Sequence, residues 1–111
     1  MNPRDRASLQ DMLKAADRAS SFTAKMSYAS FEADIQAQSA VLYQIIIIGE
    51  AVKRLSPDFR SQHPEVSWSA IAGMRDKLVH DYDGVEVERV WSTLQTNIPA
   101  LIGQLQTILA E

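Results

Sequence analysis

A short stretch in the second half of the chain carries side chains that could break a phosphodiester bond. Arg75, His80 and Tyr82 follow the order Arg, four residues, His, one residue, Tyr. Arginine presents a rigid fork of donors that suits phosphate, and histidine exchanges a proton near neutral pH. Together they could stabilise charge and move a proton while a neighbouring hydroxyl attacks the phosphate. Residues 73–84 are therefore the candidate chemical site.

The helix expected to carry this stretch does not by itself bring the two key residues together. Ser67 is a residue type that caps a helix, here one that would run through His80. At about 100° per residue, Arg75 and His80 would point about 140° apart. They could meet if the helix frays near His80, and Gly84 is a residue type that ends helices. The relative position of the pair therefore depends on the tertiary structure.

Hydrophobic periodicity predicts further helices on both sides of this stretch. The first begins with Asn2 as the cap and Pro3 at its first position, and fades near residues 20–21. We expect a turn over residues 27–30, with Ser30 capping a long second helix that ends at residues 56–57. Residues 57–66 are expected to form a loop, because Pro57 and Pro64 break regular structure. The last helix begins near Glu86.

Three features of the sequence test this helical interpretation. The run of four isoleucines at residues 45–48 favours a strand locally, but its helical surroundings on both sides favour a helix that is buried all round at this turn. Gly49 costs helix stability, so we expect another helix to approach closely there. Pro99 lies inside the last helix and should kink it or split it, with Asn97 capping the second part. The predicted fold is one all-α domain over residues 1–111, an antiparallel bundle of four to five helices.

Composition excludes several classes of chemistry. The chain has no cysteine, so disulfides, thiolate catalysis and cysteine-bound zinc are ruled out. With only two histidines we expect no metal and no other cofactor. The longest apolar run is far too short to span a bilayer, and the N-terminus shows no signal peptide. We therefore expect a soluble, cytoplasmic protein without a membrane partner.

The net charge of −3 argues against a general nucleic-acid binder. It leaves room for an enzyme that contacts RNA through a small local patch. Lys53, Arg54, Lys77 and Arg89 are candidate contacts, although each could equally be an ordinary solvated cation. A partner or a dimer cleft would have to concentrate the positive charge.

The motif and its surroundings resemble the HEPN superfamily, whose signature is Arg, four to six residues, His, any residue, Tyr. The likeness is greater to the HepT-like toxins of prokaryotic toxin–antitoxin pairs. The supporting segments occur in order along nearly the whole chain and are residues 48–56, 63–68, 71–76, 80–82 and 90–91. A three-residue motif alone is a weak signal, and the ordered flanks make it a strong one.

The resemblance implies a metal-independent endoribonuclease that acts on tRNA or mRNA. His80 would be the general acid or base, Arg75 would bind the scissile phosphate, and Asp76 would orient either of them. The products would be a cyclic phosphate and a free 5′-hydroxyl. The plainer alternatives are that His80 only complements the helix dipole, that Arg75 forms a surface salt bridge with Asp76 or Glu86, and that Asp76 is a solvated carboxylate.

Tyr82 and Glu50 have supporting roles in this interpretation. The resemblance implies that Tyr82 can help position the phosphate. In HepT systems the motif tyrosine is also the hydroxyl that a nucleotidyltransferase antitoxin of the MNT type modifies with AMP. That change would add bulk and negative charge where RNA must bind. Tyr82 could instead simply pack its ring with a wet hydroxyl. Glu50 could hydrogen-bond into the site or pair with Lys53 one turn away.

The remaining aromatic and histidine residues carry less chemistry. Trp68 and Trp91 are expected to anchor the core or an interface rather than stack on bases, and His63 precedes a proline in a loop and does no chemistry. HEPN proteins dimerise so that two motifs face one cleft, and a homodimer would supply the second histidine that acid–base catalysis needs. Two functions remain open, a ribonuclease toxin and a non-catalytic helical partner or acceptor module for the nucleotidyltransferase.

Overall fold

The computed structural model describes all residues from 1 to 111, and its regular structure is entirely helical, without a strand. The all-α prediction is therefore confirmed. The segments in chain order are α1 Pro3–Thr23, α2 Tyr28–Glu32, α3 Ile35–Arg54, α4 Pro57–Gln62, α5 Trp68–His80, the 3-10 turn η1 Tyr82–Gly84, α6 Val87–Ser92, the π-helical segment η2 Thr93–Asn97 and α7 Ile98–Leu109.

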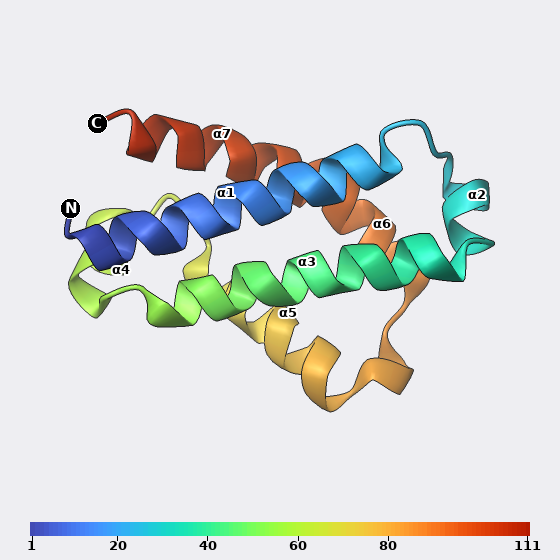
Figure 1. Ribbon diagram of the computed structural model, residues 1–111. Helices are drawn as coiled ribbons and strands as arrows, with labels where there is room; N and C mark the ends of the chain where they lie inside the picture. The colour runs from blue at the N-terminus through green and yellow to red at the C-terminus, as the bar shows by residue number, and fades with distance from the viewer.

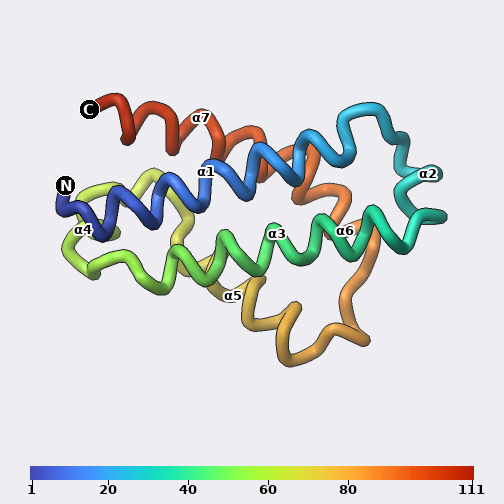
Figure 2. Tube along the Cα trace, in the orientation of Figure 1, coloured from blue at the N-terminus to red at the C-terminus, as the bar shows by residue number.

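Helix α3 is the centre of the fold (Figure 1). It lies antiparallel to α1 and also contacts α5, whereas α7 packs along α1 (Figure 2). Val41, Ile48 and Val52 of α3 are among the fully buried side chains, together with Leu9 of α1 and Leu105 of α7. By length and composition alone α3 could also cross a membrane. Its position between α1 and α5 shows that core burial is enough to explain its apolar sequence.

The isoleucine run of α3 is helical, as predicted, but it is not buried all round. Ile45 and Ile48 are buried, while Ile46 and Ile47 are only half-buried. The difference arises because α3 has neighbours on only part of its circumference, with α1 and α5 as its main contacts. One strip of α3 therefore stays open to solvent, and Tyr43 lies on it with 63% of its surface exposed.

Two short helices occupy segments that were predicted to be irregular, and both predictions were wrong in the same way. The expected loop over residues 57–66 begins with helix α4, because the Ser56 hydroxyl caps the N–H of Phe59 and Phe59 is buried. The expected turn over residues 27–30 opens helix α2. Ser27 is its cap, and Ser27 and Ser30 exchange side-chain hydrogen bonds with each other's backbone N–H. Ser30 was expected to cap the long helix, but α3 begins at Ile35 and its cap is Asp34, whose side chain accepts from the N–H of Ala37.

Pro99 does not split the last helix with a new cap, although the helix axis changes direction between α6 and α7 (Figure 2). The backbone stays helical from α6 through η2 into α7, and the N–H of Ile98 donates to the carbonyl of Thr93. Asn97 makes no side-chain capping hydrogen bond. Because proline lacks an N–H and crowds the preceding turn, the helix is widened over one turn before it, which is how a π-helical segment arises.

A buried carboxylate ties the start of α1 to the junction between α3 and α4. The Asp5 side chain is 3% exposed and accepts hydrogen bonds from the Ser56 N–H at 2.9 Å and the Ser56 hydroxyl at 2.8 Å. It also accepts from the Asn2 amide at 3.0 Å, while Asn2 caps the N–H of Asp5 as predicted. Asp5 thus joins two segments that are far apart in the chain.

Replacing Asp5 with alanine should lower the free energy of unfolding by about 2 to 3 kcal/mol, because it leaves the buried donors of Ser56 without a charged acceptor. Urea denaturation monitored by circular dichroism would measure the change. Asp17→Ala is the matched control on α1, since Asp17 is exposed and makes no ion pair, and it should stay within about 0.5 kcal/mol of the unchanged protein. Equal stability of the two variants would contradict the structural role of Asp5.

Candidate active site on helix α5

The start of α5 is anchored by packing rather than by a capping side chain. Ser67 occupies the cap position, as expected, but makes no side-chain capping hydrogen bond. Trp68 is 5% exposed, packs near Phe59, and donates from Nε1 to the carbonyl oxygen of His63 at 2.9 Å. Trp68 is therefore a core anchor, in line with the prediction, and it sets where α5 begins.

Gly49 lets α3 and α5 approach closely at the arginine of the motif. A β-carbon built on Gly49 would overlap the Cβ of Arg75 and lie 2.7 Å from its Cγ, with the Ile71 carbonyl oxygen at 3.4 Å. These are atoms near the backbone of α5, so they cannot swing aside as the tip of a side chain could. The predicted close approach is confirmed, and it presses Arg75 against α3.

Arg75 sits in a cluster of four charges. Its Nη1 donates to Asp76 Oδ1 at 3.0 Å, and its Nη2 pairs with a carboxylate oxygen of Glu50. Asp76 also accepts from the ammonium group of Lys53. Glu50 therefore pairs with Arg75 and not with Lys53, and Asp76 touches Arg75 rather than His80. The cluster sums to zero charge, and the buried Nε of Arg75 is left without a hydrogen-bond partner.

The hydrogen bonds within the cluster shift the pKa values of Asp76 and Arg75 so that the charged form of each is favoured. The hydrogen bond from Lys53, followed by that from Arg75, lowers the pKa of Asp76, and the hydrogen bond to Asp76 raises the pKa of Arg75. Since the folded-state pKa of Asp76 lies below its ordinary value of about 3.9, the stabilisation is fully present above that value. It is lost as the pH falls through the lowered pKa. Asp76 and Arg75 are therefore both charged at neutral pH.

His80 and Tyr82 lie at the far end of α5 and are exposed. The helix stays regular through His80, so it does not fray there, and the five-residue spacing keeps His80 turned away from Arg75. Neither side chain forms a hydrogen bond or an ion pair. Tyr82 is 73% exposed, so its ring is not packed into the core. Asp81, with φ −143°, ends the helix, and Gly84 follows in the turn η1 without a positive φ.

The other predicted RNA contacts differ in their surroundings. Lys53 is engaged by Asp76, and Arg54 pairs loosely with Asp11 at 3.6 Å on the surface. Lys77 and Arg89 form no ion pair. No group of three or more histidine and acidic side chains is placed to hold a metal ion. The four cations therefore do not form one patch within a single chain.

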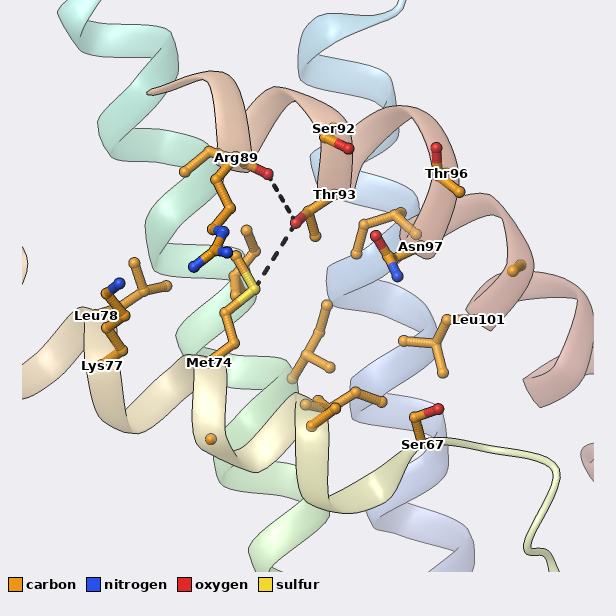
Figure 3. A pocket seen from close by; sticks show the side chains of 18 of the residues that line it. Ser67, Met74, Lys77, Leu78, Arg89, Ser92, Thr93, Thr96, Asn97 and Leu101 are labelled. Carbon is orange, nitrogen blue, oxygen red and sulfur yellow. Dashed lines mark hydrogen bonds between the residues drawn. The ribbon is translucent and has the colours of Figure 1, made fainter. Parts of the chain in front are cut away.

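The sequence did not indicate a cleft that opens beside α5. It has a volume of about 680 Å³ and lies between α5 and the continuous helix formed by α6, η2 and α7 (Figure 3). Lys77 and Arg89 line it from opposite walls. The walls come from segments that are separated in the chain, so periodicity could not reveal that their faces would stay apart. The sequence feature that could have indicated the cleft is Pro99, because it disturbs the last helix at η2, and η2 forms part of the wall of the cleft.

Gly49→Ala should destabilise the fold by about 1 to 3 kcal/mol, because the added methyl group must push α5 and Arg75 away from α3. Gly103→Ala is the matched control on α7, where a β-carbon meets nothing within 4 Å. It should instead stabilise the protein by about 0.5 to 1 kcal/mol through helix propensity. Thermal unfolding of both variants measures these opposite signs. A stabilising effect of Gly49→Ala would contradict the close approach.

Comparison with known proteins identifies the family. Residues 12–108 match the family model described as Ribonuclease HepT-like. The chain is 39% identical over 100 residues to "Probable ribonuclease HepT" of Thermococcus cleftensis, covering 90% of this chain and 91% of the other. It is 36% identical over 106 residues to "Putative RNase MJ0127" of Methanocaldococcus jannaschii, covering 96% and 88%.

A third relative, "Putative RNase TTE0752" of Caldanaerobacter subterraneus subsp. tengcongensis, is 44% identical over 84 residues and the match covers 76% and 75% of the two chains. No solved structure matches this chain. The family match spans the helices that build the charged cluster and the exposed end of α5, including Arg75, His80 and Tyr82. This chain therefore belongs to the HepT-like ribonuclease family.

Proposed function

We propose that this protein is the toxin of a cytoplasmic toxin–antitoxin pair, a metal-independent endoribonuclease that cleaves tRNA or mRNA. The observation that carries the proposal is the arrangement of α5. Arg75 is held against α3 by Gly49 and by its carboxylate partners, while His80 and Tyr82 stand exposed at the end of the same helix. In a chain of the HepT-like ribonuclease family, an arginine suited to phosphate and a histidine suited to proton transfer on one helix support this proposal.

The reaction uses these side chains and one further acid. His80 accepts the proton of the ribose 2′-hydroxyl, and the 2′-oxygen attacks the adjacent phosphorus. The bond from phosphorus to the 5′-oxygen breaks, and that oxygen takes up a proton from a second acid. Arg75 stabilises the negative charge that builds on the phosphate oxygens. The products are a 2′,3′-cyclic phosphate and a 5′-hydroxyl end.

A homodimer would complete this site. One chain offers a single exposed histidine in the motif, and Arg75 and His80 point in different directions from α5. A second copy facing the first would bring the partner's histidine as the second acid–base group. It would also double the local positive charge in a protein whose net charge is −3. The exposed strip of α3 that carries Tyr43 is an available contact surface.

Tyr82 is the proposed point of control by an antitoxin of the MNT nucleotidyltransferase type. Its ring is 73% exposed and its hydroxyl has no hydrogen-bond partner, so it is accessible as an acceptor for AMP. Transfer joins the tyrosine oxygen to the α-phosphorus of ATP and releases pyrophosphate. The added phosphate brings negative charge beside His80 and repels the RNA backbone.

The second candidate is a non-catalytic acceptor module for the nucleotidyltransferase. One observation favours it, namely that Glu50 and Asp76 occupy the donors of Arg75 in this structure. An arginine that stays paired with two carboxylates has little left to offer a phosphate. The ribonuclease requires RNA to displace at least one of these carboxylates, because the unpaired Nε of Arg75 is buried.

An assay in EDTA separates the two candidates. Purified protein, with unmodified Tyr82 confirmed by intact mass, should cleave RNA and leave cyclic phosphate ends. His80→Ala should lower the cleavage rate at least about a hundredfold, since it removes the proton carrier. His63→Gln is the matched control, because the other histidine lies in a loop beside Glu65 and should leave the rate unchanged. Equal background in all three proteins would favour the acceptor module.

Mixed dimers test the shared site. When unchanged and His80→Ala chains are co-expressed in equal amounts, about a quarter of the activity should remain, because a cleft that needs both histidines works only in the unchanged dimer. Light scattering should give the mass of a dimer for both proteins. A monomer mass at micromolar concentration, or about half of the activity in the mixture, would show that the site is not shared between chains.

A further inference from the structure

The cleft beside α5 lies on the other side of this helix from the charged cluster. On a helix Lys77 points about 160° away from Arg75, and it lines the cleft while Arg75 does not. The floor is aliphatic and the cleft holds no aromatic side chain. Met74, Leu101 and Ala100 are among the apolar residues that line it. Its volume of about 680 Å³ is in the range of ligand pockets, about 300 to 1,000 Å³.

Polar side chains at the rim of the cleft suit a ligand that combines an anionic group with a flat, partly apolar ring. Lys77 from α5 and Arg89 from α6 lie on opposite walls at one end and form no ion pair, with Glu86 as the only acidic lining residue (Figure 3). Asn97, on the η2 wall, has an exposed amide without a hydrogen-bond partner. Thr93 is already satisfied, since its hydroxyl donates to the Arg89 carbonyl oxygen at 2.9 Å and also contacts the Met74 sulfur of α5 at 3.9 Å, which joins the two walls at this point (Figure 3).

The cleft opens toward the same side of α5 as the motif histidine. Lys77 and His80 are three positions apart on a regular helix, so their side chains are neighbours on its surface. An RNA strand that has one phosphate at His80 would therefore have an adjacent phosphate close to Lys77. Arg89 faces that position from the other wall.

We propose that this cleft binds one unpaired nucleotide of the RNA next to the cleaved bond. The base enters between Met74 and Leu101, Asn97 hydrogen-bonds the base edge, and Lys77 and Arg89 hold the phosphate. Aliphatic side chains can enclose a splayed base much as aromatic ones do, and single-stranded RNA offers such bases. The assignment rests on the proposed ribonuclease function for the identity of the ligand. The cleft would then choose which base flanks the cleavage site.

Binding can be measured without cleavage. Protein labelled with ¹³C at the methionine methyl groups is titrated with the four ribonucleoside 5′-monophosphates, and with 2′-O-methyl tetranucleotides that cannot be cleaved. Met74 lines the cleft while Met12 is buried in the core, so Met74 should shift and Met12 should not. We expect the tetranucleotides to bind, with one base preferred. Arg89→Gln should weaken binding about tenfold or more, since it removes a charge-assisted hydrogen bond.

A second variant tests the proposal by filling the cleft with a bulky side chain. Ala100→Trp places a large ring in the cleft from an exposed position, and Gln106→Trp, also exposed on α7 but outside the cleft, is its control. Ala100→Trp should abolish the Met74 shift and, in a cleavage assay, flatten the base preference beside the cut. Gln106→Trp should change neither. Circular dichroism confirms that both variants fold.

Three other outcomes would overturn the assignment, and a fourth would overturn only the ribonuclease on which it rests. Monophosphates that shift Met74 while tetranucleotides do not would assign the cleft to a free nucleotide. A change in oligomeric mass with Ala100→Trp would assign it to a second copy of the chain. RNA cleavage that keeps its base preference in the filled variant would leave the ribonuclease intact and remove the cleft from it. Conversely, base-selective shifts of Met74 in a protein that cleaves no RNA would keep the nucleotide site and reject the enzyme.

Discussion

The contact between Gly49 and Arg75 is the constraint on which the rest of the site depends. Only a residue without a side chain allows α5 to lie so close to α3 at this point. The approach brings Arg75 beside Glu50 and brings Asp76 within reach of Lys53. The absence of a β-carbon at Gly49 therefore allows the charged cluster, which has no net charge, to form. Ion pairs of this kind form only where two helices hold their side chains at short range.

Helix α5 separates two surfaces of different character. On one side it is pressed against α3 and carries the paired arginine. On the other it stands away from α6, η2 and α7 and leaves an aliphatic cleft with unpaired cations at its rim. His80, at the end of the helix, is exposed and unpaired. In the proposed ribonuclease the surface that carries Arg75 would hold the scissile phosphate, and the cleft would hold a neighbouring nucleotide.

The pairing of Arg75 has a consequence for function. In this structure the arginine is oriented by two carboxylates, which hold it in place and also compete with a phosphate for its donors. RNA would have to offer more than these carboxylates do, and a single phosphate in water offers little. A second chain and a bound neighbouring nucleotide would each add to the attraction. This is why the proposed activity is linked to a dimer and to the cleft.

The sequence by itself determined the helical class, the long apolar helix α3, the close approach at Gly49 and the family to which the motif belongs. These features are local, since periodicity, a helix-breaking residue and a spaced motif can be read within one segment. It failed at α2 and α4, where serine caps and buried aromatic residues form helices in segments that contain turn signals. Only the tertiary structure decided that Glu50 pairs with Arg75, that Asp5 joins Ser56, and that α5 and η2 stay apart around a cleft. These contacts join residues distant in the chain, and their distances depend on how the helices pack.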